Sequence, residues 1–386
     1  MLDNILNNAI QILKMLEDNG YEAYMVGGFP RDYVLGIKSD DIDITTNAIP
    51  SEVQRIFPNN FFKSIKYQTV TVVMNSYTYE VTTYRTESDY KDHRHPYTKV
   101  STSLKSDIKR RDFTINALCM DKELNIIDYT NGLNDIKNKV IKTVGSPDVR
   151  FFEDALRMFR AFRFVSKLNF KIDSDTYQAI KKNAHLVKYI SKERVKEELI
   201  KMLNAPYFED ALPQLIESKI LSEYKEIEHA LSYLYARYRK VDLILLLSLA
   251  TFFKGSICEE LILSKRERKL LEKIFEYTKL LTSRSFSRES LLDLDIEAFD
   301  YSFELMNLLD NLTYNKDDVL DLYYSLPIKS IRDLAVNGMD IKKVFKIKDS
   351  PQIGEMLKRA LTLVIHSRID NNAHEIIEEL KKEYNG

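Results

Sequence analysis

Short apolar stretches separated by glycine and polar turns fill the first 150 residues of this 386-residue chain. Residues 3–18 carry apolar side chains at helical spacing and predict a helix that ends at Asn19-Gly20. Residues 21–28 predict a strand that enters a glycine turn, and residues 31–36 predict a short helix. Residues 69–85 contain two β-branched runs joined by Asn75-Ser76, which predicts a hairpin.

The pattern changes twice further along the chain. Residues 86–109 are polar and irregular, and we expect a mobile loop there. Ordered structure resumes over residues 110–120, and residues 124–132 predict a strand and a turn. Beyond about residue 150 the spacing of apolar positions is almost wholly helical. We therefore expect an α+β fold, with a small mixed sheet in an N-terminal head and helices after it.

Composition and charge narrow the classes of function. The formal net charge of −1 excludes a general polyanion binder, so a nucleic-acid partner would have to be held by local patches. The apolar run over residues 242–253 is too short to span a membrane, and the N-terminus lacks a signal-peptide pattern. Cys119 and Cys258 lie far apart in apolar surroundings, which indicates a reducing compartment. We expect a cytoplasmic protein with no membrane partner.

Acidic residues gather directly after a glycine turn. Residues 41–45, DIDIT, alternate polar and apolar side chains, which puts Asp41 and Asp43 on one face of a strand, and Glu80 is the one acid on the neighbouring ribbon. Carboxylates suit Mg²⁺, which usually keeps one or two of them together with substrate phosphates. A glycine turn and the guanidinium of Arg31 can both bind phosphate. A solvated surface turn is the alternative interpretation.

A second constellation lies in residues 152–164, FEDALRMFRAFRF. Asp154, Arg157, Arg160 and Arg163 recur every three residues, so a helix would carry them as successive neighbours. A surface helix with ion pairs is one interpretation. In the other, the aspartate accepts from an exocyclic amine and an arginine donates to a ring nitrogen. Such a pair would accept cytosine and adenine and reject uracil and guanine.

Five motifs now appear in order, and together they resemble those of the class II tRNA nucleotidyltransferases, the bacterial CCA-adding enzymes, and their relatives the bacterial poly(A) polymerases. They are G-G-x-x-R-D (27–32), D-I-D (41–43), R-R-D-F-T-I-N-A (110–117), E-D-x-x-R (153–157) and K-E-R-V-K-E-E-L (192–199). The resemblance covers roughly the first 200 residues, and a looser similarity to the family's tail follows near the C-terminus.

The resemblance implies four domains. A polymerase-β-like nucleotidyltransferase head would occupy residues 1–150, and a helical neck that recognises the base would occupy residues 151–205. A helical body over residues 206–315 and a tRNA-binding helical tail over residues 316–386 would follow.

The resemblance also implies roles for single residues. Asp41 and Asp43 would hold catalytic Mg²⁺, and Glu80 would be the third catalytic carboxylate. Asp154 and Arg157 would form the amino-acid template that selects C or A. The full set of residues that the resemblance assigns to nucleotide binding is Gly27, Gly28, Arg31, Asp32, Arg111, Asp112, Asn116, Asp154, Arg157, Arg160 and Arg163.

Some positions depart from the family's pattern. Phe29-Pro30 stand where small or β-branched residues are usual, and Pro30 removes one N–H that could meet a phosphate. Tyr67-Gln68 stand where His-Gly is common. The segment TESDYKDHRHP, residues 86–96, is present here, whereas relatives that add only CC lack most of it, which favours addition of the terminal A. Its Asp92, His93, Arg94 and His95 are interpreted as a solvated loop. A zinc site at His93 and His95 is not expected, because no further Cys or His ligands accompany them.

We therefore expect a template-independent CTP(ATP):tRNA nucleotidyltransferase that builds or repairs the 3′-CCA end of tRNA, with Mg²⁺ as cofactor and pyrophosphate as product. An A-adding enzyme, a poly(A) polymerase and a non-catalytic RNA-binding protein on the same fold are the alternatives. Basic stretches at residues 265–269, 342–343 and 346–348 could grip tRNA phosphates or form solvated helix faces. Monomer and homodimer both remain open.

Overall fold

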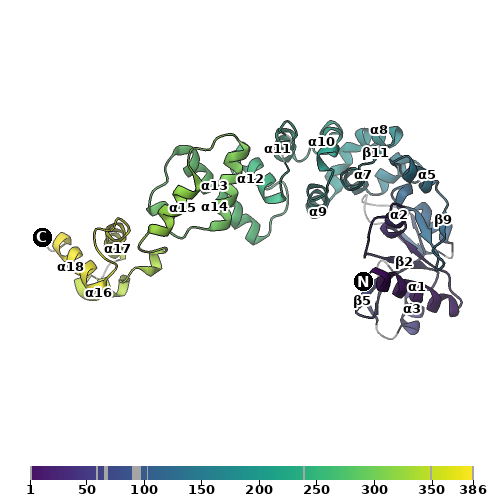
Figure 1. Ribbon diagram of the computed structural model, residues 1–386, viewed down its shortest axis with the longest axis horizontal. Helices are drawn as coiled ribbons and strands as arrows, with labels where there is room; N and C mark the ends of the chain where they lie inside the picture. Colours follow the sequence, from purple (N-terminus) through teal and green to yellow (C-terminus); the bar gives the residue numbers. More distant parts are fainter. Residues whose placement is uncertain are drawn as a thin grey trace. The chain divides into compact units, whose positions relative to one another are not determined.

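The computed structural model describes residues 2–57, 60–64, 68–88, 97–101, 103–237, 240–347 and 350–384 (Figure 1). Tyr67, Lys348 and the loop residues Asp92, His93, Arg94 and His95 lie outside the described residues. The chain divides into two compact units, residues 1–243 with 260–262 and residues 244–259 with 263–386. The finer division into head, neck, body and tail stays a prediction.

The N-terminal part is built on a seven-stranded sheet in the order β3-β4-β5-β2-β1-β8-β9. Strands β2 and β5 run parallel, and the other neighbours run antiparallel. The strands are β1 (Ala23–Val26), β2 (Asp43–Thr46), β3 (Asn60–Ser64), β4 (Thr69–Met74), β5 (Tyr77–Thr83), β8 (Leu118–Met120) and β9 (Ile126–Asp128).

One face of this sheet is covered and the other carries polar side chains. Helices α1 (Leu2–Asp18) and α3 (Pro50–Ile56) pack on the first face, where Ile44, Val70 and Val81 are buried with residues of both helices (Figure 1). Asp43, Thr45, Glu80 and Thr82 alternate with these apolar residues along β2 and β5, so they lie on the opposite face. The pleat therefore separates the apolar core from the polar face.

The predicted hairpin is confirmed. Strands β4 and β5 pair antiparallel with Met74 opposite Tyr77. The two residues between them, Asn75 and Ser76, have φ values of 48° and 68°. Positive φ at both central positions is the geometry of a type I′ turn, whose twist matches that of the flanking strands. The turn fixes the register of β5, and with it the position of Glu80.

The expectation of an irregular loop over residues 86–109 is wrong at both ends of that range. Strand β6 (Arg85–Ser88) pairs antiparallel with β7 (Tyr97–Val100), and helix α4 (Leu104–Lys109) follows. Pairing between residues distant in sequence outweighs their polar composition here, as tertiary context often does. Asp107 on α4 is fully buried.

The remainder of the first unit is mostly helical. After α2 (Gly28–Val34), described with the site, the sequence continues with α5 (Gly132–Lys137), α6 (Pro147–Glu153), α7 (Leu156–Leu168), α8 (Ser174–Asn183), α9 (Lys192–Leu203), α10 (Phe208–Glu217) and α11 (Lys225–Tyr235). Strands β10 (Val140–Ile141) and β11 (Lys171–Ile172) pair parallel. This pairing connects the segment after α5 to the segment after α7.

The second unit is built from helices. They are α12 (Leu243–Lys254), α13 (Lys265–Ser283), α14 (Ile296–Leu308), α15 (Lys316–Ser325), α16 (Gly338–Phe345), α17 (Ser350–Ile365) and α18 (Ala373–Tyr384). Tyr277 of α13 and Phe299 of α14 meet edge to face, with ring centroids 6.2 Å apart. Among the described residues no helix is long and apolar enough to cross a bilayer. The α+β prediction is confirmed.

A buried glycine joins α5 to the turn that carries Asn116. A Cβ on Gly132 would lie 2.2 Å from the carbonyl oxygen of Thr114. We expect Gly132→Ala to lower the free energy of unfolding by about 1–3 kcal/mol, because backbone must move to relieve the clash. The measurement is the urea midpoint of the intact protein. Gly354→Ala, inside α17 with nothing within 4 Å of the new Cβ, is the control and should be neutral or stabilising. Equal midpoints for the two variants would contradict the close approach.

Candidate active site

A cleft of about 1250 Å³ opens beside the polar face of the sheet, and helices α7 and α9 contribute to its wall. A smaller cavity of about 380 Å³ adjoins it and shares Asp43, Arg85, Arg110 and Arg111. Glu80 lines the smaller cavity. Every other residue proposed from the sequence lines the larger one: Gly27, Gly28, Arg31, Asp32, Asp41, Asp43, Arg111, Asp112, Asn116, Asp154, Arg157, Arg160 and Arg163.

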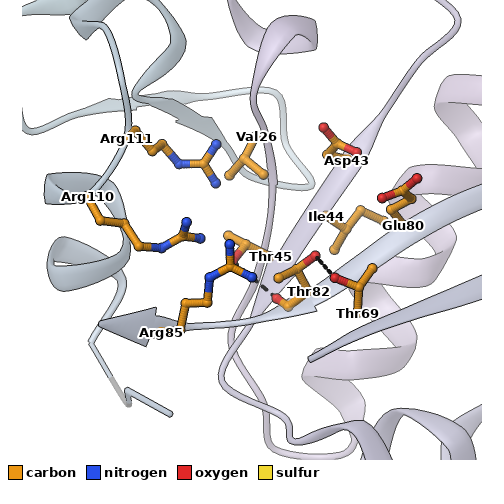
Figure 2. Close-up of a pocket in the computed structure, with 10 residues that line it drawn as sticks. All are labelled: Val26, Asp43, Ile44, Thr45, Thr69, Glu80, Thr82, Arg85, Arg110 and Arg111. Atoms are coloured by element: carbon orange, nitrogen blue, oxygen red, sulfur yellow. Dashed lines mark hydrogen bonds between the residues drawn. The ribbon is translucent and has the colours of Figure 1, made fainter. Parts of the chain in front are cut away.

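The parallel pairing of β2 with β5 brings two carboxylates together. Asp43 and Glu80 are direct partners across the two strands, and Figure 2 shows them side by side at one end of the smaller cavity. Asp41 precedes the strand and is exposed. Among the described residues no group of three or more His, Cys, Asp or Glu is close enough to hold a metal ion. The three predicted carboxylates therefore do not form one closed cluster.

The glycine turn allows the backbone to approach Asp43. Gly27 has φ 77°, and a Cβ there would lie 3.1 Å from Oδ2 of Asp43. Gly28 begins α2 (Gly28–Val34), and Pro30 occupies its first turn. The first N–H groups of a helix have no partner within the helix, so proline is tolerated there. The departure at Pro30 is therefore compatible with the local fold.

Arg31 is fully buried and held by neighbouring polar groups. Its Nε donates to Oδ1 of Asp32 at 2.8 Å, and its Nη1 donates to Oδ1 of Asn116. Lys167 donates to the other oxygen of Asp32 at 3.2 Å. Asp32 and Asn116, which the resemblance assigns to the nucleotide, thus bond to an arginine in this structure and fix its direction.

Asp112 holds a second arginine. Its Oδ2 accepts from Nε of Arg160 at 2.7 Å, and its Oδ1 accepts from the backbone N–H of Phe113 at 2.8 Å. Burial would raise the pKa of Asp112, but the charge and hydrogen bond of Arg160 outweigh it and lower the pKa to about 2. The carboxyl is therefore ionised throughout the physiological range.

The expectation that Asp154 shares a helix face with the three arginines is wrong. Helix α6 ends at Glu153, Asp154 has an extended backbone (φ −146°, ψ 104°), and α7 starts at Leu156. The Asp154 carboxylate accepts two hydrogen bonds from Arg194 of α9, at 3.1 and 2.8 Å. Arg157 donates to Glu153 at 2.7 Å and to the carbonyl oxygens of Arg150 and Arg110. Asp154 and Arg157 line the same cleft, but different residues hold their side chains in place.

Arg111 and Arg163 also belong to the basic lining of the cleft. Arg163 donates to the buried Glu198 of α9 at 3.2 Å, and burial, together with the charge of Arg160, lowers its pKa from the ordinary value. Arg111 pairs with Asp107 at 3.3 Å, yet its Nε is buried and has no hydrogen-bond partner within the described part of the chain. A buried donor without a partner is rare and marks a place where a ligand could bind.

The chain is similar to known proteins in both sequence and structure. The protein-family model described as "Poly A polymerase head domain" matches residues 23–142. A second family model, "Probable RNA and SrmB- binding site of polymerase A", matches residues 169–231, and a third, for tRNA nucleotidyltransferase domain 2, matches residues 241–380. The CCA-adding enzyme of Geobacillus sp. (strain WCH70) is 36% identical, with 96% of both chains covered. That of Bacillus pumilus (strain SAFR-032) is 37% identical, also with 96% of both covered. The chain belongs to the CCA-adding enzyme family.

Solved structures agree with this assignment. The crystal structure of the Bacillus stearothermophilus CCA-adding enzyme in complex with CTP superposes with a TM-score of 0.79 at 30% identity, covering 99% of this chain and 98% of that one. The Thermotoga maritima CCA-adding enzyme complexed with tRNA shares the fold, with a TM-score of 0.62 at 20% identity and 98% and 95% covered. The chain is thus a nucleotidyltransferase of this family.

Several residues that shape the cleft could not be assigned from the sequence. Arg194 and Glu198 were inside the quoted K-E-R-V-K-E-E-L motif, which carried the signal without assigning single positions. Arg85 and Arg110 line both cavities, and in Figure 2 their guanidinium groups face the space opposite Asp43 and Glu80. Nothing in the local sequence distinguishes Lys167 from a surface lysine.

The low pKa of Asp112 predicts a pH-dependent contribution to stability. A pKa of about 2, below the ordinary 3.8, means that the ionised carboxylate stabilises the fold above about pH 4. This contribution is lost as the pH falls from about 4 to about 2. We expect Asp112→Asn to lower the free energy of unfolding by about 2 kcal/mol at pH 7 and by clearly less at pH 3. Urea unfolding measures this free energy at each pH.

Asp148→Asn is the matched control for this prediction. Asp148 pairs with Lys182 on the surface, and the two side chains are 49% and 70% exposed. Asp148→Asn should therefore lower the free energy of unfolding at pH 7 much less than Asp112→Asn does. A loss for Asp112→Asn that is the same at both pH values would contradict the assigned ionisation.

Proposed function

We propose that the chain adds the terminal C, C and A to the 3′ end of tRNA, with CTP and ATP as substrates. The observation that carries this proposal is the convergence of residues from five separate sequence motifs on one cleft, next to a register-matched pair of carboxylates. The relatives that match over the full chain are CCA-adding enzymes, and those of solved structure include complexes with CTP, ATP and tRNA.

Asp41 and Asp43 are the proposed holders of Mg²⁺. Their carboxylate oxygens are the donors that a hard cation prefers, and two carboxylates plus substrate phosphates make a sufficient ligand set without a third protein ligand. When bound, the ion neutralises charge at the phosphates and lowers the pKa of the acceptor, which is the 3′-hydroxyl of the tRNA. Glu80, next to Asp43 across the strands, is the proposed third carboxylate on the acceptor side.

The basic residues of the cleft are proposed to bind the triphosphate. Arg31, Arg160 and Arg163 each pair with an acid and line the cleft, and Arg31 also donates to Asn116. Their remaining N–H groups can donate to phosphate oxygens. The orphaned Nε of Arg111 offers a further donor. Holding the triphosphate still while the acceptor hydroxyl approaches in line is the main source of catalysis in this type of transfer.

Asp154 and Arg157 are proposed to select the base. The bidentate bond from Arg194 fixes the Asp154 carboxylate, which leaves acceptor capacity for an exocyclic amine. Glu153 and two carbonyl oxygens fix the Arg157 guanidinium. A rigid acceptor and a rigid donor would accept the amine and ring nitrogen of cytosine or adenine, with no nucleic-acid template.

The test is an extension assay with Mg²⁺ on tRNA transcripts that end before CCA, after C and after CC. With CTP and ATP we expect stepwise addition that stops at CCA. We expect Asp43→Ala to lower the rate by at least about a thousandfold, because the electrostatic contribution at the reacting phosphate is lost. Glu123→Ala, an exposed acid in the turn between β8 and β9, is the control and should leave the rate unchanged.

Each other outcome assigns a different function. Growth only on the transcript that ends in CC would identify an A-adding enzyme, and long A tracts on any RNA would identify a poly(A) polymerase. Binding of tRNA without extension would identify a non-catalytic RNA-binding protein. Full activity of Asp43→Ala would contradict the proposed catalytic site.

A further inference from the structure

The aromatic ring of Phe164 lies where three arginines meet. Phe164 belongs to α7, is 3% exposed and lines the cleft. The guanidinium carbons of Arg163, Arg31 and Arg160 lie 4.6, 5.3 and 5.6 Å from the centroid of its ring. All three distances are within the roughly 6 Å at which a guanidinium is attracted to an aromatic face.

Three like charges around one ring repel one another unless the surroundings offset the repulsion. Part of the offset comes from acids, since Asp32, Asp112 and Glu198 each bond to one of the three arginines. Those acids come from three different elements or turns, and none of them contacts all three arginines in the described structure. The Phe164 ring, by contrast, lies within about 6 Å of all three guanidiniums.

The ring itself is held in a fixed orientation. Phe113, fully buried next to Asp112, meets Phe164 edge to face, with centroids 5.7 Å apart and an interplanar angle of 81°. An edge-to-face contact of this kind favours one ring orientation over others. The faces of the Phe164 ring, which carry the negative part of the quadrupole, therefore stay directed at fixed places in the arginine cluster.

The geometry points to Phe164 as a positioning residue that gathers Arg31, Arg160 and Arg163 into one receptor for a polyphosphate chain. The ligand class is a nucleoside triphosphate, held through its phosphates, and the ring acts through the arginines without touching the phosphates. This inference rests on the proposed function for the identity of the nucleotide. It extends that proposal by assigning a role to an uncharged side chain that no motif singled out.

The first test compares Phe164→Leu with Phe162→Leu in the intact protein. Phe162 lies on the same helix and is equally buried, and no arginine lies over its ring among the described residues. The probes are inorganic tripolyphosphate and CTP, titrated by calorimetry. We expect Phe164→Leu to weaken binding of both probes about tenfold, and Phe162→Leu to change it less than about twofold. Equal losses in the two variants, or no loss in Phe164→Leu, would overturn the proposal.

Kinetics give a readout that a merely structural role would not move. In Phe164→Leu the KM values for CTP and ATP should rise together by about tenfold, with a smaller change in kcat, because ground-state and transition-state binding of the phosphates weaken alike. The ratio of C to A incorporation should stay the same, since Asp154 and Arg157 are untouched. Phe164→Tyr, which keeps the ring, should restore KM. A change confined to kcat or to base choice would overturn the role.

A second series keeps the proposal testable if Phe164→Leu does not fold. Phenylalanine with one, two or three ring fluorines, incorporated at position 164, lowers the negative charge of the ring face with little change in size. Tripolyphosphate affinity should fall stepwise with fluorination at position 164 and stay level at position 162. A level response at both positions would overturn the proposal. Binding that depends on the ring in a protein that extends no tRNA would instead overturn the proposed function and leave this inference standing.

Discussion

The cleft depends on the pairing of buried and partly buried arginines with buried acids. A guanidinium withdrawn from water is costly unless a carboxylate or amide meets it, and an unpaired buried acid is equally costly. Asp32 meets this requirement for Arg31, and Asp112 meets it for Arg160. The same bonds fix the direction of the arginine side chains, so one set of contacts serves both the stability of the fold and the shape of the site.

This pairing shows what the aspartates of two sequence motifs contact in the structure. The aspartates of G-G-x-x-R-D and R-R-D bond to arginines in the structure, so they fix the direction of those arginine side chains. Asn116 links the two pairs, because it accepts from Arg31 and donates to Asp112 at 3.3 Å. A chain of contacts therefore runs from α2 through the turn at Asn116 to α7, and it connects the sheet to the helices of the first unit.

Local features of the fold could be predicted from sequence, and features that depend on distant residues could not. The alternation in β4 and β5 and the Asn75-Ser76 turn are set by neighbours in sequence, and the structure has both. The direct pairing of Asp43 with Glu80 depends on strand register across 37 residues, which no local pattern specifies. The break at Asp154 was hidden because the three-residue spacing continues through it. Its cause is a side chain that bonds to the N–H of Leu156 and to Arg194, 40 residues away.

The candidate site follows the same division. The five motifs supplied residues that line one cleft, whereas their contacts required the three-dimensional structure. Asp154 and Arg157 are not neighbours on one helix, as their spacing implied. Asp154 is held by Arg194 of α9, and Arg157 is held by Glu153 and backbone carbonyl oxygens. Phe164 carried no signal at all, since a phenylalanine on a helix is ordinarily a core residue.

The most direct test of this account is a crystal structure of the chain with CTP and Mg²⁺. The account predicts phosphate oxygens within hydrogen-bond distance of Arg31, Arg160 and Arg163, the cytosine amino group at the Asp154 carboxylate, and the metal ion at Asp41 and Asp43. A triphosphate bound instead against Arg85 and Arg110, with no phosphate oxygen near the three arginines around Phe164, would contradict it.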